Sequence, residues 1–248
     1  MLIRNAVYVI MRFVRRFNRR DFHGYTPTSP TNPDDTLFGH LIRTYAPGNS
    51  FADICCMWTM HGSVAYYAES KGATKVTAFD AMDPTPEFLQ TRQQKNSSVR
   101  FVQGNIDTID LAATVGKHDV VWCTGLLYHT PDPFGVIGKL LSIADKYAII
   151  GSKTLPDLPG ISNTAIFLPG LSELERSKLM PFWGSPVHKP FGLRPAWDYE
   201  WWWLLSGSAI ASMIETFPGW KVSSIYHRAR HGTNDNCVVV AERIMSAH

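Results

Sequence analysis

The chain has no long hydrophobic runs and little cysteine. The longest apolar stretch near its start, Ala6–Met11, is too short for a membrane span or for the core of a signal peptide. Four cysteines among 248 residues lack the paired spacing of a zinc site and are too few for a secreted disulfide scaffold. We therefore expect a cytoplasmic protein without a metal site, whose thiols are buried and reduced; the thiols are those of Cys55, Cys56, Cys123 and Cys237.

Acidic residues are missing from the first twenty positions, which contain six arginines. The net charge of +3 is thus uneven, because the rest of the chain carries 18 of the 24 basic side chains against all 21 acidic ones. This slightly acidic body disfavours nucleic acid as a partner. The motif G-x-G-x-x-G is also missing after the first predicted strand, which argues against a dinucleotide oxidoreductase.

Residues 1–20 have the periodicity of an amphipathic helix with one basic side. Its apolar side comprises Ile3, Val7, Ile10, Met11, Val14 and Phe17. Such a helix could lie on an anionic membrane surface, but we favour packing on the domain or on a second subunit, which leaves a homo-oligomer open. Together with the Pro-rich linker that follows, it predicts an N-terminal appendage over residues 1–35 and a main domain over residues 36–248.

From residue 36 onward, helix and strand patterns alternate. Strands are expected at 51–56, 75–79, 99–102, 119–123 and 147–151, and helices at 36–45, 63–71, 85–94, 108–115 and 134–144. This alternation predicts an α/β fold with a Rossmann-like, mostly parallel sheet and helices on both faces. Residues 152–205 break the pattern as an insertion near the ligand-binding edge, and a helix at 208–217 with strands at 220–226 and 236–241 predicts a closing antiparallel hairpin.

The segment from Phe51 to Asp83 is the most informative part of the chain. A strand is followed by a loop with almost no glycine (CCMWTMHG), a helix, and a second strand that leads directly into Asp80. Strand, loop, helix, strand and acid in this order form a nucleoside pocket in a parallel sheet. A carboxylate at a strand tip can accept hydrogen bonds from two ribose hydroxyls, which we expect of Asp80; an ordinary solvated loop acid is the alternative.

This layout resembles the class I S-adenosylmethionine-dependent methyltransferases over roughly Phe51 to Arg243. The run DVVWCTGLLYHTPDP at Asp119–Pro133 is similar to the LYH-x-PDP run of the group that includes wobble-uridine tRNA modifiers. The resemblance implies S-adenosylmethionine as cofactor. It places the methionine end after strand one, the ribose after strand two, the adenine after strand three, and both cofactor and acceptor after strand four. The cofactor-binding residues it implies are Asp53, Cys55, Met57, Trp58, His61, Gly62, Asp80, Ala81, Met82, Asn105, Ile106, Thr124 and Gly125.

The first loop departs from this family. The family has glycines at alternate positions because the backbone must approach the cofactor closely, whereas this chain has Cys55, Met57 and Thr59, and Gly62 comes late. Either the loop makes the same contacts by another path or cofactor binding has been lost; we favour the first, because the other motif residues remain in order. Two further alternatives stay open. Asp107 competes with Asn105 for the adenine edge, and His61 either orients the methionine carboxylate or caps the next helix.

Methyl transfer mainly requires that the nucleophile be held in line with the S–CH₃ bond. His129 is the candidate base for an acceptor that arrives protonated, with a structural histidine as the alternative. The ring of Tyr128 could form a wall beside the sulfonium or belong to the core. In the insertion, the predicted acceptor contacts are His188, Tyr199 and Trp202, with Trp201 and Trp203 beside them, although a packed aromatic lid would have the same composition.

The sequence therefore predicts methyl transfer to an O, N or C nucleophile of a small or medium-sized acceptor. One rival is methyl or carboxymethyl transfer on tRNA, which the LYH-x-PDP run suggests and the acidic body disfavours. A second rival is a non-catalytic binding module with the same fold, which the glycine-poor loop suggests.

Overall fold

The computed structural model describes residues 36–155, 157–158, 160–172, 174–175, 178, 201–230 and 234–244. Two sets of predictions lie outside these described residues. They are the basic helix and linker over residues 1–35, and the acceptor contacts His188 and Tyr199.

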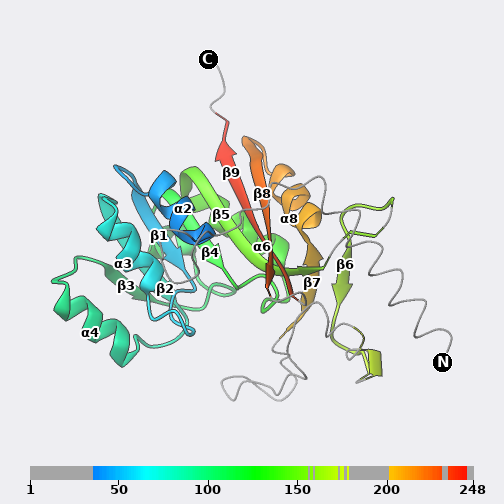
Figure 1. Cartoon of the computed structure of the whole chain (residues 1–248), viewed down its shortest axis with the longest axis horizontal. Coiled ribbons are helices and arrows are strands. Elements are labelled where there is room, and N and C mark those ends of the chain that lie inside the picture. Colours follow the sequence, from blue (N-terminus) through cyan, green and yellow to red (C-terminus); the bar gives the residue numbers. More distant parts are fainter. Residues whose placement is uncertain are drawn as a thin grey trace.

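Within the described residues, a nine-stranded mixed sheet forms the centre of the fold (Figure 1). Its parallel part has the order β3-β2-β1-β4-β5. These strands are β1 (Ser50–Ile54), β2 (Lys75–Asp80), β3 (Arg100–Gln103), β4 (His118–Thr124) and β5 (Ala144–Leu155). The hairpin of β8 (Trp220–Arg230) and β9 (Asn234–Arg243) adds to it, because β9 pairs antiparallel with β5. The predicted α/β fold with a mostly parallel Rossmann-like sheet is confirmed.

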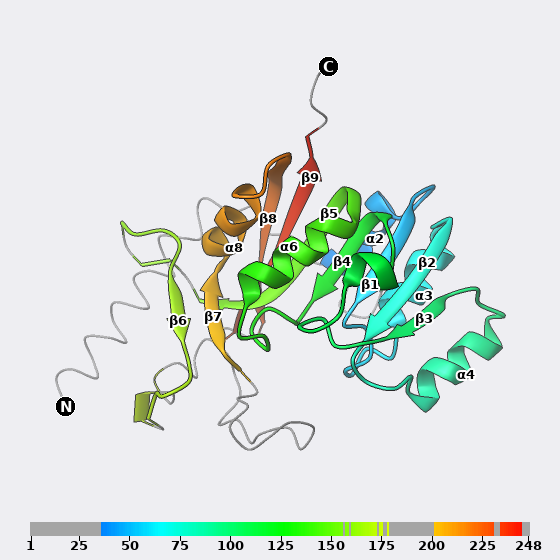
Figure 2. The same ribbon diagram turned by 180° about the vertical axis from the view of Figure 1, so that it is seen from behind.

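Helices cover both faces of the sheet, as the two views in Figures 1 and 2 show. One apolar cluster joins the sheet to α2 (Leu37–Tyr45), α3 (Ser63–Ser70) and α4 (Pro86–Gln94). The other joins it to α5 (Leu111–Thr114), α6 (Pro133–Ile143) and α8 (Gly207–Glu215). Because both faces are buried, the central strands are apolar almost without interruption, as parallel strands usually are.

Short polar side chains determine where the helices begin. The N-cap side chains of Thr36, Thr85, Asp110, Asp132 and Ser206 each accept a hydrogen bond from the backbone N–H three residues later. The helix α5, predicted over residues 108–115, is shorter than predicted. Residues 105–109 form a turn instead, in which the Thr108 and Ile109 amides donate to the Asn105 carbonyl.

The insertion extends the sheet. The strand β5 runs to Leu155, so the predicted strand end at 151 and insertion start at 152 were wrong by several residues. The strand β7 (Trp203–Ser206) pairs parallel with the end of β5, and β6 (Ala165–Phe167) pairs antiparallel with β7. Figure 2 shows β6 and β7 on the side of the sheet opposite β3 and α4.

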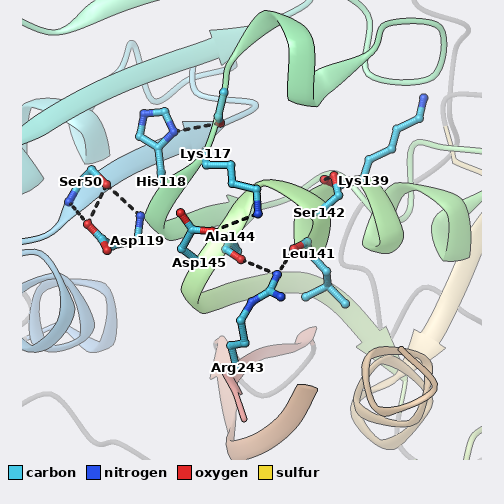
Figure 3. A network of polar contacts seen from close by, with 11 residues as sticks. Ser50, Lys117, His118, Asp119, Lys139, Leu141, Ser142, Ala144, Asp145 and Arg243 are labelled. Carbon is cyan, nitrogen blue, oxygen red and sulfur yellow. Dashed lines mark hydrogen bonds and ion pairs between the residues drawn. The ribbon is translucent and has the colours of Figure 1, made fainter. Parts of the chain in front are cut away.

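Polar contacts hold together the edge where the parallel strands begin (Figure 3). Asp119 Oδ2 accepts from both the amide and the hydroxyl of Ser50, each at 2.8 Å, which joins the starts of β1 and β4. Lys117 donates to Asp145 at 3.1 Å, which joins the start of β5. The opposite edge, where the parallel strands end, is the one that carries the predicted functional residues.

Candidate active site

The carboxyl ends of four parallel strands lie side by side. The register pairs Ile54 with both Phe79 and Cys123, and Asp80 with Gln103. The loops at 55–62, 81–85, 104–110 and 125–132 therefore open on one edge of the sheet, which is where α/β proteins bind ligands. The structure brings together the predicted residues of these loops.

Asp80 lies at the end of β2 and is only 6% exposed. Its Oδ2 accepts from the Met57 amide at 2.8 Å, and its Oδ1 accepts from the Met82 amide at 2.9 Å. Burial raises the pKa of Asp80, while hydrogen bonds from the amides of Met82, Met57 and Ala81 oppose the shift. Each carboxylate oxygen can accept more than one hydrogen bond, so Asp80 keeps capacity for ligand hydroxyls.

The first loop has positive φ angles at four residues, three of which are not glycine. The φ angle is positive at Cys55 (64°), Thr59 (54°), His61 (48°) and Gly62 (70°). Cys55 and Thr59 occupy two of the positions where the resembled family has glycine. This left-handed conformation costs a residue other than glycine roughly 1–2 kcal/mol, and it is especially rare for a β-branched side chain. At Gly62 glycine is needed for space as well, because a Cβ there would lie 2.4 Å from the Phe88 ring.

This strain predicts that Thr59→Gly stabilises the protein. The free energy of unfolding should rise by about 0.5–1 kcal/mol, since relief of the left-handed strain exceeds the extra entropy of glycine in the unfolded chain. Denaturant unfolding of both proteins measures the change. The matched control is Thr74→Gly, an exposed threonine without positive φ, which should lower stability. Equal effects at the two positions would show that Thr59 is not strained.

The other side chains of the first loop point in different directions. The Met57 side chain is fully buried in the core, so it is the Met57 amide that meets Asp80. Trp58 is 54% exposed. His61 Nδ1 lies 3.1 Å from Thr85 Oγ1, at the start of α4, and 3.7 Å from a carboxylate oxygen of Glu87. The alternative in which His61 caps α3 is wrong, because the N-cap of α3 is Gly62 and has no side-chain hydrogen bond.

Asp53 caps α3 from the neighbouring strand. Its Oδ2 accepts from the Ala65 amide at 3.1 Å, in the first turn of the helix, and the residue is 3% exposed. Burial raises the pKa of Asp53 to about 7; the hydrogen bond from Ala65 opposes the shift, and the negative charge of Asp80 adds to it. The family resemblance implies a cofactor role for Asp53, and in the structure its carboxylate caps a helix.

The raised pKa predicts how Asp53→Asn changes stability with pH. The folded protein keeps a proton on Asp53 up to about pH 7, whereas the unfolded chain loses it near pH 3.8, so this group lowers stability as the pH rises through that window. Asparagine can still accept from Ala65 and does not ionise. Without ligand, Asp53→Asn should therefore gain at least about 1 kcal/mol at pH 8 and much less at pH 5. Thermal unfolding at the two pH values measures this, and an equal change at both would contradict it.

The loop after β3 forms a tight turn around Ile106. The Asn105 carbonyl accepts from the Thr108 and Ile109 amides at 3.1 and 2.9 Å, and Asn105 Oδ1 accepts from the Asp107 amide at 3.0 Å. Among the hydrogen bonds within the described part of the chain, none uses the Ile106 amide. Asp107 Oδ1 accepts from the Thr130 hydroxyl at 2.9 Å, whereas the Asn105 side chain is exposed. Asn105 and the Ile106 amide are therefore better placed than Asp107 to meet a ligand.

The loop after β4 carries an aromatic cluster. Gly125 has a φ of 92° and donates its amide to the Gly151 carbonyl at 2.9 Å, which turns the chain away from the sheet. The Tyr128 ring centroid lies 4.2 Å from that of His129 and 4.8 Å from that of Trp201. The His129 amide donates to the Leu126 carbonyl at 2.7 Å, which fixes the turn. Both predicted catalytic side chains thus lie at this edge of the sheet.

The insertion is bonded to the same turn. The Trp202 amide donates to the Tyr128 carbonyl at 2.7 Å, and Trp203 Nε1 donates to the Pro131 carbonyl at 3.0 Å. It is the Trp201 ring, rather than that of Trp202, that packs against Tyr128. Lys153 Nζ lies 4.3 Å from the centroid of the Trp201 ring, and no sequence signal had marked this lysine. Trp201 is only 6% exposed and contacts both an aromatic ring and a cation.

All four cysteines are free thiols, and Cys56, Cys123 and Cys237 are buried. The described residues contain no cluster of three or more His, Cys, Asp or Glu side chains suited to a metal ion. In the same part of the chain, no helix has the length and apolar character needed to cross a membrane.

Comparisons with known proteins agree with this geometry. Residues 59–144 match the family described as a methyltransferase domain. The fold is similar to magnesium protoporphyrin IX methyltransferase from Synechocystis PCC 6803 with bound S-adenosylhomocysteine, with a TM-score of 0.55, 18% identity and 98% of both chains covered. It is also similar to the N-terminal domain of EvdMO1 with S-adenosylhomocysteine and D-fucose (TM-score 0.56, 16% identity, 94% of this chain and 96% of that one). A third similar structure is protein PH0226 from Pyrococcus horikoshii OT3 (TM-score 0.55, 15% identity, 92% and 98%). No protein of curated function matches the sequence.

The comparisons show a shared fold and one matched domain. At such identities the structural likeness shows the fold, and the matched domain runs from the first loop to the end of α6. Similar folds have been solved with bound S-adenosylhomocysteine and with bound S-adenosylmethionine.

Proposed function

We propose that this protein transfers the methyl group of S-adenosylmethionine to an O, N or C nucleophile of a small-molecule acceptor. The observation that carries the proposal is the position of Asp80. Its carboxylate ends β2, is held by two loop amides, and keeps acceptor capacity at the edge where the four loops meet.

The residues at this edge fit an adenosyl group. Asp80 would accept from the ribose hydroxyls, and the Ile106 amide with the exposed Asn105 would meet the adenine edge. The left-handed backbone of the first loop lets the chain approach the methionine end closely without glycine at each position. The remaining lining comes from the predicted set: Cys55, Met57, Trp58, His61, Gly62, Ala81, Met82, Thr124 and Gly125.

When bound, the cofactor supplies a strongly electrophilic methyl group, so the chain mainly has to orient the acceptor. His129 would remove a proton from an acceptor that arrives protonated. The Tyr128 ring would form an aromatic wall near the sulfonium, and Trp201 extends this wall on the acceptor side.

A small acceptor is supported by two observations. One similar structure is a magnesium protoporphyrin IX methyltransferase, and another is a domain solved with D-fucose. A magnesium porphyrin and a sugar are both small molecules. The chain beyond its first twenty residues is also slightly acidic, which disfavours the tRNA acceptor that the LYH-x-PDP resemblance suggests.

Two experiments test the proposal. Calorimetry with S-adenosylhomocysteine should show binding, and an absence of binding would favour the non-catalytic module. Incubation with methyl-labelled S-adenosylmethionine and a cell extract, followed by separation of small molecules from RNA, should place the label in a small molecule. Label in the tRNA fraction would overturn the proposed acceptor class while leaving the reaction type intact.

A further inference from the structure

A polar network joins the loop after β3 to α6 and to the loop after β4. Lys139, on α6, donates to the carbonyls of Ile106 and Asp107 at 2.6 and 2.9 Å. Thr130 donates to Asp107 Oδ1 at 2.9 Å and accepts from the Asp132 amide at 3.1 Å, and it is 1% exposed. Ile106 and Asp107 are therefore held by side chains from two other parts of the fold, α6 and the loop after β4.

This network fixes the direction of the Ile106 amide. The Ile106 side chain is 4% exposed and packs in the core, while Lys139 holds the carbonyl on the other side of the same residue. The peptide that carries the Ile106 N–H has the Asn105 carbonyl at its other end, and that carbonyl accepts from the Thr108 and Ile109 amides and from the Thr108 hydroxyl. Hydrogen bonds to a carbonyl polarise its peptide and make the attached N–H a stronger donor. The turn thus presents one oriented, polarised amide that no described residue uses.

We infer that Lys139 and Thr130 are positioning residues that hold the Ile106 amide for the base of the bound nucleoside. The inference rests on the proposed function, which places an adenosyl group at this edge. An adenine ring offers an acceptor to such an amide, whereas hypoxanthine carries a proton on the corresponding ring nitrogen. Since Thr130 directly follows His129, the same network also sets the distance between the base-binding loop and the turn with the candidate catalytic histidine.

The test is selectivity between two nucleoside probes, S-adenosylhomocysteine and S-inosylhomocysteine, measured by calorimetry. The wild-type protein should prefer the adenine probe. Lys139→Met should weaken binding of the adenine probe by about tenfold and reduce its preference over the inosine probe, because the amide is no longer held in place. Lys139→Arg, which can still donate to both carbonyls, should restore most of the preference.

The matched control is Lys117→Met. This lysine pairs with Asp145 at the opposite edge of the sheet, and Figure 3 shows Lys139 pointing away from that pair. Replacement of Lys117 should leave the affinities for both nucleoside probes unchanged. If Lys139→Met does not fold, Thr130→Val removes the other contact to Asp107 and should lower the same preference.

The outcomes separate the inference from the proposed function. Unchanged affinities in the Lys139 and Thr130 variants, or equal losses for both probes with an unchanged ratio, would overturn the positioning role while the proposed function stands. Binding of neither probe to the wild-type protein would overturn the proposed function and the inference with it.

Discussion

Replacement of Asp80 by alanine should weaken binding of S-adenosylhomocysteine by about 100-fold. A hydrogen bond to a charged group contributes about 1.5–3 kcal/mol, and two ribose hydroxyls would lose a shared carboxylate. The Met57 and Met82 amides would also lose their acceptor, which loosens the first loop where it meets β2. Calorimetry of the wild-type and variant proteins measures the loss.

The control for this prediction is Asp83→Ala. Asp83 is an exposed acid in the same loop, and its carboxylate accepts from Gln103 Nε2 at 3.0 Å instead of from the first loop. Its replacement should change affinity less than about threefold, since an exposed charge near the surface contributes little. An Asp80→Ala protein that folds and binds within threefold of the wild type would show that Asp80 does not hold the ribose.

Replacement of His129 by alanine should lower kcat by about 100-fold when the acceptor is protonated, because a positioned base contributes about 10²–10⁴-fold. Cofactor affinity should change little, since the His129 amide bonds to Leu126 and its ring packs near Tyr128 and Trp201. Steady-state kinetics with the labelled acceptor gives kcat, and calorimetry gives the affinity.

His40→Ala provides the comparison. His40 lies on α2, which belongs to the cluster on one face of the sheet and is not part of the four loops. The His40→Ala protein should keep the wild-type kcat. If His129→Ala has wild-type kcat, or loses kcat and cofactor affinity together, His129 is a structural residue of the turn and no base is needed there.

Much of the fold followed from local patterns. Strand and helix periodicity predicted the alternation from residue 36 to the closing hairpin, because a two-sided parallel sheet requires apolar strands and one-sided helices. The boundaries were less well predicted. The end of β5 depends on its partners β7 and β9, which come about fifty or more residues later in the chain.

The site was predictable where a residue's place in the strand order decides its position. Asp80 follows an apolar strand, so its place at the sheet edge was evident from sequence. The contacts of Asp53, His61 and Lys153 were not evident. Asp53 caps a helix whose N-cap has no side chain, His61 reaches Thr85 of the next loop, and Lys153 reaches a tryptophan from the insertion. Each contact joins segments whose proximity no pattern in the sequence indicates.

The sequence by itself determined the order of strands and helices and the acid at the tip of β2, because these depend on residue type and spacing along one segment. Only the tertiary structure decided that a loop poor in glycine adopts left-handed angles at Cys55, Thr59 and His61. It alone also decided that Lys139 and Thr130 hold the turn at Ile106. Such features arise when packing between distant segments overrides the local preference of a residue, and spacing along the chain does not reveal them.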